Sequence, residues 1–116
     1  MREGKFLELI QVAQKIIQDN NELLLSAVEL EHWRTAAALK AFGGAIQDAL
    51  NDFIYCSHEG VTQASAKIVE KRDKALAWKN INIESRNWNN VADRDSEIEG
   101  YQQILIVFGR WDDTEL

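Results

Sequence analysis

The sequence contains little cysteine, no proline and no long apolar run. Its 116 residues include one cysteine, Cys56, which cannot form an intramolecular disulfide and so gives no sign of an oxidising compartment. The first residues lack the basic stretch and continuous apolar segment of a signal peptide, and no later run approaches the roughly 18 apolar residues of a membrane span. We therefore expect a cytoplasmic protein that has no membrane partner.

Positive charge is also scarce, with 13 Lys and Arg residues against 19 Asp and Glu residues. The formal net charge of −6 argues against a protein that binds a phosphate backbone through clustered basic side chains, so no direct nucleic-acid partner is expected. The charges are unevenly distributed, because residues 67–79 are mainly basic and residues 93–115 mainly acidic. Such runs are typical of a solvated surface, and this layout also suits electrostatic steering of a partner.

Motifs that would identify an enzyme are missing. The glycine pair at 43–44 lacks the lysine and hydroxyl residue of a phosphate-binding loop, and the sequence has neither paired cysteines at metal-ligand spacing nor a nucleophile elbow. Glu29 and His32 have the spacing of one di-iron ligand pair, but His58 has Tyr55 where the second glutamate would be needed. We therefore predict no metal, no cofactor and no catalytic residue.

Residues 56–59, with the sequence Cys-Ser-His-Glu, place a thiol close to an imidazole. Adjacent residues on a helix point about 100° apart, and no recognisable pattern supplies an oxyanion hole or an orienting group. Helix capping and surface roles are therefore the favoured interpretation of this segment.

The composition supports one domain over residues 1–116 that buries its own core, with 46% hydrophobic and 28% charged residues. Apolar residues recur at three- and four-residue steps over residues 4–19, which predicts a helix there. Asp19, Asn20 and Asn21 are predicted to end this helix, and the two asparagines to cap the next one. No internal repeat is visible in the sequence.

The next segment, residues 22–57, carries an apolar stripe that keeps one helical phase across Gly43 and Gly44. A turn at the glycines would not require a shared phase, so a continuous helix is predicted. Each glycine costs roughly 1 kcal/mol against alanine in a helix interior, and a closely approaching helix would compensate for that cost. The alternative is a helix-turn-helix that bends at the glycine pair.

The second half of the chain is less uniform. A third helix is predicted over residues 63–79, followed by an irregular, asparagine-rich stretch over residues 79–95. A capping-box pattern predicts a last helix over residues 96–108, but the apolar residues 103–108 equally suit a strand that pairs with residues 80–84. The predicted fold class is mainly α: a bundle of three to four helices with one long central helix, and with a short two-stranded sheet as the open alternative.

The predicted central helix favours self-association. It would be about 54 Å long, whereas its neighbours would each reach roughly 24 Å, so part of its apolar stripe would lack cover within one chain. A second copy related by two-fold symmetry would supply that cover in a homodimer or higher homo-oligomer. Small residues on a second helix face are predicted to form this interface, namely Ala37, Ala41, Gly44 and Ala45.

The irregular stretch is the predicted binding surface. Trp88 can stack, the arginines can form paired hydrogen bonds with a carboxylate or phosphate, and asparagine amides both donate and accept. The predicted ligand- or partner-binding residues are Arg86, Asn87, Trp88, Asn89, Asn90, Arg94 and Arg110. The competing interpretation is that the asparagines form turns and that Trp88 fills the end of the bundle.

These features favour a non-enzymatic, acidic helical module for protein–protein interaction, which self-associates and binds or inhibits another protein. Phage-encoded inhibitors and toxin-neutralising immunity proteins are often small and acidic in the same way, but this is an analogy. The alternative is a homo-oligomer that binds a nucleotide-like ligand at the Trp, Arg and Asn residues. A metal-dependent or hydrolytic enzyme ranks third.

Overall fold

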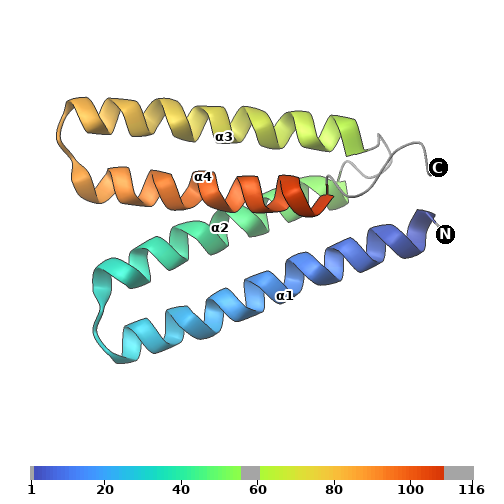
Figure 1. Cartoon of the computed structure of the whole chain (residues 1–116), viewed down its shortest axis with the longest axis horizontal. Coiled ribbons are helices and arrows are strands. Elements are labelled where there is room, and N and C mark those ends of the chain that lie inside the picture. Colours follow the sequence, from blue (N-terminus) through green and yellow to red (C-terminus); the bar gives the residue numbers. More distant parts are fainter. Residues whose placement is uncertain (1, 56–60, 109–116) are drawn as a thin grey trace.

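Four helices make up the part of the chain that the computed structural model describes, residues 2–55 and 61–108. They are α1 (Arg2–Glu29), α2 (Trp33–Tyr55), α3 (Val61–Glu84) and α4 (Trp88–Phe108). The helices form two hairpins, α1–α2 and α3–α4, which lie side by side in the order α1, α2, α4, α3 (Figure 1). The result is a flat helical bundle whose Cα extents are 46 × 33 × 18 Å.

The mainly α bundle is therefore confirmed, and the alternative of a short sheet is wrong. Residues 80–84 lie in α3 and residues 103–108 lie in α4, and no strand occurs within the described ranges. The apolar run 103–108 forms a helix because its buried members, Ile104, Val107 and Phe108, recur at helical spacing, while Ile106 between them is exposed. Packing on one helix face outweighs the strand propensity of the β-branched residues.

The long central helix over residues 22–57 is also wrong, although the helix does continue through Gly43 and Gly44 as predicted. The asparagines at 20–21 lie inside α1, and the chain turns at residues 30–32 instead. Asn20 is 5% exposed and its Nδ2 donates to the Leu39 carbonyl of α2 at 2.8 Å. It therefore joins two helices rather than capping one.

The predicted irregular stretch over residues 79–95 is reduced to a tight turn at residues 85–87. The predicted third and fourth helices are present, but α3 continues to Glu84 and α4 begins at Trp88. The asparagines are therefore distributed over the end of one helix, the turn and the start of the next. A long binding loop does not exist in this region.

The second hairpin repeats the first after 55 residues, although the sequence shows no visible repeat. At the two turns, the end of the first helix, the turn residue with positive φ and the start of the second helix all keep this separation. The matched pairs are Glu29 and Glu84, Glu31 and Arg86, and Trp33 and Trp88. The backbone hydrogen bonds of the two turns match as well: His32 N donates to Ala27 O, and Asn87 N donates to Asn82 O.

An approximate two-fold axis relates the two hairpins. Their turns lie at the same end of the molecule, and α2 and α4 cross at its centre (Figure 1). Phe53 and Phe108, which are matched by the 55-residue shift, stack on each other with ring centroids 3.7 Å apart and an interplanar angle of 14°. The second hairpin therefore gives α2 the cover that the sequence analysis assigned to a second copy.

The core is centred on the packing between α2 and α4. Gly100 allows their close approach, because an added Cβ would lie 2.7 Å from the Phe42 carbonyl oxygen and 2.9 Å from the Ala45 Cβ. Ile46, Leu50 and the stacked phenylalanines fill the centre beside this crossing. Because the crossing holds the two hairpins together, it also fixes the relative positions of the two turns.

Candidate protein-binding surfaces

Large apolar side chains are exposed around the two hairpin turns. Fifteen such residues are exposed in the described part of the chain, and ten of them lie within residues 23–33 and 76–88. We call these ten residues the turn surface: Leu23, Leu25, Val28, Leu30 and Trp33 on the first hairpin, and Leu76, Trp78, Ile81, Ile83 and Trp88 on the second. This concentration is unusual, because single exposed apolar residues are normally scattered over a protein surface.

Most of the predicted binding residues lie at the second turn, and one of them, Trp88, belongs to the turn surface. Residues 86–90 are all exposed, and Trp88 is 61% exposed, so it does not fill the end of the bundle. Asn87 has a structural role, because its Oδ1 accepts a hydrogen bond from Asn90 N at 3.5 Å at the start of α4. Trp88, Arg86 and Asn89 have side chains available to a partner.

Arg94 lies apart from this group. It forms an ion pair of 2.8 Å with Glu97 on the same helix, and both side chains are partly buried beside α2. Burial raises the pKa of Glu97, with a further increase from Asp93, while the guanidinium of Arg94 acts in the opposite direction. The remaining predicted residue, Arg110, lies outside the described residues.

The predicted small-residue interface is split between two environments. Ala45 is buried at the crossing with α4, whereas Gly44 is exposed and a Cβ added there would meet nothing within 4 Å. Ala37, Ala41 and Gly44 line an open depression of about 500 Å³ between α2 and α4, which we call the α2–α4 groove. Its lining also includes Lys40, Ala45, Asp48, Asp93, Arg94, Glu97 and Tyr101.

An ionic cluster lies on the α3 side of this groove. Lys71 Nζ of α3 lies 2.9 Å from Asp48 Oδ2 and 2.7 Å from Asp52 Oδ2, and the Tyr101 hydroxyl donates to Asp48 at 3.2 Å. Burial alone would lower the pKa of Lys71, but the hydrogen bonds and charges of the two aspartates raise it to about 12. Burial and then the charge of Asp48 raise the pKa of Tyr101 to about 12.

The other chemical patterns in the sequence do not come together as sites. Glu29 ends α1 and His32 lies in the following turn, where both side chains are exposed. Among the described residues, no group of three or more histidine, cysteine, aspartate or glutamate side chains is arranged to hold a metal ion. Residues 56–59 lie outside the described residues. None of the helices over residues 2–55 and 61–108 has the length and apolar character needed to span a bilayer.

Of the ten residues of the turn surface, only Trp88 was predicted from the sequence as a binding residue. Trp33 and Trp78 are 62% and 54% exposed, but their sequence contexts are helical and give no sign of a surface role. A faint signal exists, because Glu29 precedes Trp33 by the same four residues that separate Glu84 from Trp88. This repeat of two residue types is too short to identify a duplicated hairpin without the backbone.

Comparisons of the chain with protein-family models, with curated proteins and with solved structures found no match.

Proposed function

We propose that the protein is a non-enzymatic protein-interaction module that self-associates through its turn surface. The observation that carries this proposal is the concentration of exposed tryptophan and aliphatic side chains at both hairpin turns. Aromatic residues are enriched at the centres of protein interfaces because they bury a large area with little loss of conformational freedom. Trp33 and Trp88 occupy matched positions at the starts of α2 and α4, which suits a symmetric contact.

The exposed area is sufficient for a dimer if both turns take part. The ten residues are between 39% and 65% exposed, so together they offer many hundreds of Å² of mainly apolar surface. A standard stable interface buries about 800 Å² on each partner. One turn alone would provide about half of that area, so we expect both hairpins of each copy to contribute.

A pair of polar substitutions tests self-association. The variant Leu25→Gln/Trp88→Gln changes one exposed residue at each turn, and the control Leu7→Gln/Ile106→Gln changes one residue of each hairpin at the opposite end of the molecule. Light scattering coupled to gel filtration should give a dimer mass for wild type and control, and a monomer mass for the turn variant. All four positions are exposed, so thermal melts at matched concentration should show folded variants. A wild-type mass of one chain at micromolar concentration would contradict the proposal.

A further inference from the structure

We propose that the face formed by α2, α3 and α4 is a separate docking site, which accepts an acidic amphipathic helix of another protein. This inference goes beyond self-association, because the site runs along α2, α3 and α4, and Trp78 is the one residue that it shares with the turn surface. It begins in the α2–α4 groove. On the α3 side that groove continues into a second depression of about 310 Å³, and the two share Asp48, Glu97 and Tyr101.

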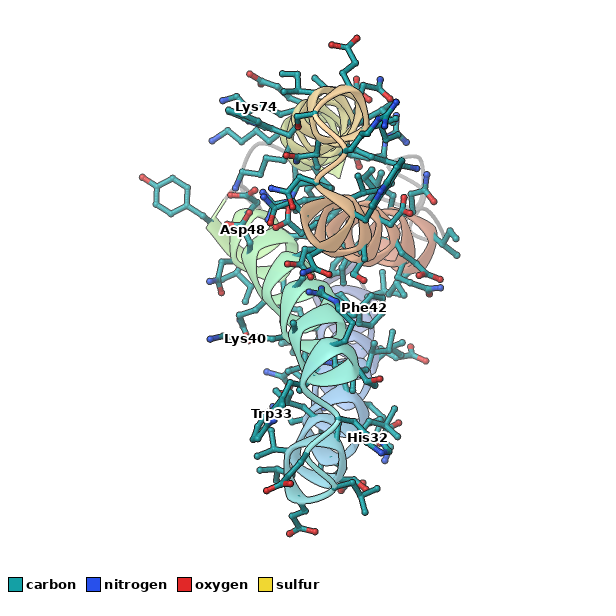
Figure 2. The ribbon with its side chains drawn as sticks, turned by 90° about the vertical axis from the view of Figure 1, so that its left-hand side faces the viewer. His32, Trp33, Lys40, Phe42, Asp48 and Lys74 are labelled. Atoms are coloured by element: carbon teal, nitrogen blue, oxygen red, sulfur yellow. The ribbon has the colours of Figure 1, made fainter. Side chains whose placement is uncertain are left out.

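The two walls of this extended groove come from α2 and α3, with α4 as its floor. Figure 2 shows Lys40 and Asp48 projecting from α2 toward the same side of the molecule as Lys74 of α3, while Phe42 points the other way. Lys74, Ala75 and Trp78 line the α3 side, and Trp78 is 54% exposed. The site is therefore a long, open channel between two helices rather than an enclosed pocket.

The shape of the α2 wall suits a helix. The small side chains of Ala37 and Ala41, together with Gly44, allow the backbone of a partner to approach closely, and nothing within 4 Å would meet a Cβ at Gly44. From Ala37 to Asp48 the wall is about 16 Å long, which corresponds to three turns of helix. Large apolar residues on such a helix would contact the alanines on one side and Trp78 on the other.

The charges of the groove specify the partner. Lys71 pairs with Asp48 and Asp52, Arg94 with Glu97, and Arg34 with Asp93, so the acidic groups in the groove already have cationic partners. Lys40 and Lys74 form no ion pair with any residue in 2–55 or 61–108, and they lie on opposite walls. A helix with carboxylates on both flanks of an apolar ridge would complement both lysines.

A nucleic acid would fit this groove less well. Its phosphates could pair with the two lysines, but a continuous row of phosphates would also lie against Asp48, Asp93 and Glu97, whereas a peptide helix can place its carboxylates at the lysines alone. The small apolar wall and Trp78 would bind an apolar ridge, which a helical peptide has and a phosphate backbone lacks. An acidic peptide helix is therefore the occupant that uses the whole lining.

A display selection tests the proposal directly on the full chain. The probe is a library of amphipathic helices of about four turns, each with a fixed apolar ridge and with flanking positions randomised among Glu, Lys and Ser. The affinity of each selected helix is then measured for the variants Gly44→Leu, Lys40→Glu and Lys74→Glu. Lys15→Glu is the control, because Lys15 is an exposed residue of α1 that does not line the groove. The self-association variant Leu25→Gln/Trp88→Gln is tested in parallel.

The expected result is enrichment of Glu on the flanks, with at least a tenfold loss of affinity in the three groove variants and no loss in Lys15→Glu. Gly44→Leu should remain as stable as wild type, so a loss of binding would mean that the leucine side chain occupies the space where the partner helix packs. Binding by the Leu25→Gln/Trp88→Gln variant should be at least as tight as that of wild type, because neither residue lines the groove, and this separates the site from the proposed dimer. Selection of Lys-rich helices, tighter binding of a single-stranded oligonucleotide, or a selection without groove-dependent winners would each overturn the proposal.

Discussion

At the residue scale, three of the glycines within the helices have different environments, namely Gly43, Gly44 and Gly100. A Cβ at Gly43 would lie 2.6 Å from Asn20 Nδ2, so this glycine leaves room for the amide that crosses from α1. Gly100 faces the Phe42 carbonyl, and Gly44 faces open space. The sequence predicted that another helix approaches Gly44 closely. Within the chain, close approach occurs instead at Gly43, which faces α1, and at Gly100 of α4, which faces α2.

This difference predicts opposite effects for two identical substitutions. Gly44→Ala should raise the free energy of unfolding by roughly 1 kcal/mol, because alanine favours the helix and the added methyl group meets no atom. Gly100→Ala should lower it by about 1–3 kcal/mol, because the methyl group would collide with the backbone of α2 at 2.7 Å.

Urea denaturation followed by circular dichroism measures both changes under one set of conditions. Each variant acts as the control for the other, since both place alanine inside a helix. A loss of stability in Gly44→Ala would show that this position is covered in solution, which would support a close helix contact there within a dimer.

At the element scale, both turns end a helix with a residue in the left-handed region. Glu31 and Arg86 each have φ of 57°, and the hydrogen bonds that follow them close a Schellman motif at the ends of α1 and α3. Glycine or asparagine usually occupies this position, and another residue costs roughly 1–2 kcal/mol there. Without those residue types, neither turn could be located from the sequence.

The helices themselves could largely be predicted, because their apolar residues repeat at helical spacing. The phase argument was right at Gly43–Gly44, where the stripe continues within one helix. A shared helical phase did not mean one helix across residues 30–32, because two helices of a hairpin can carry apolar residues in phase on both sides of a tight turn. Periodicity identifies the buried face of a helical segment, but it does not show that two such segments belong to one continuous helix.

The ionic cluster that joins α3 to α2 predicts a loss of stability at alkaline pH. The pKa of Lys71 is about 12 in the folded protein against 10.5 ordinarily, so its ion pairs stabilise the fold below pH 10.5 and are lost as the pH rises through 12. The pKa of Tyr101 rises from 10.0 to about 12, so the protonated phenol stabilises the fold below pH 10.0 and this contribution is lost over the same window.

The variant Lys71→Met/Tyr101→Phe removes both groups while keeping most of their apolar contacts. Its free energy of unfolding should fall less than that of wild type between about pH 10 and pH 12. Lys15→Met is the control, since Lys15 is highly exposed beside Asp19 and its ion pair is screened by solvent. If the free energy of unfolding fell equally steeply with pH in wild type and in the double variant, the titration of Lys71 and Tyr101 would not be coupled to folding.

At the scale of the whole molecule, the second hairpin occupies the position that a second chain was expected to take. The sequence predicted that a second copy covers the apolar stripe of a helix over residues 22–57; that helix is wrong, and within the chain α4 covers α2 instead. Of the 55-residue-matched positions, a few retain identical residues, such as Trp33 with Trp88 and Phe53 with Phe108. Of the predicted binding residues, 86–90 lie exposed at the second turn, whereas the exposed apolar residues at the first turn were not predicted.

The approximate two-fold axis makes a prediction about how the hairpins hold together. Phe53 and Phe108 are 1% and 0% exposed, and they stack near the ends of α2 and α4, where they join the two hairpins. Truncating either ring to alanine should lower the free energy of unfolding by about 3–5 kcal/mol. The two single variants should be similar in stability, because the rings occupy matched positions and each is the other's stacking partner.

The double variant Phe53→Ala/Phe108→Ala should lose less stability than the sum of the two single variants, by about 1–2 kcal/mol. The first truncation already removes the stacking contact, so the second removes only the ring's remaining contacts with its own hairpin. Denaturation followed by tryptophan fluorescence and by circular dichroism should give coincident transitions in the wild type, because Trp33 and Trp88 report on different hairpins that share one core. Fully additive costs, or separate transitions for the two probes in the wild type, would mean that each hairpin is stabilised independently and that the stacked rings do not couple them.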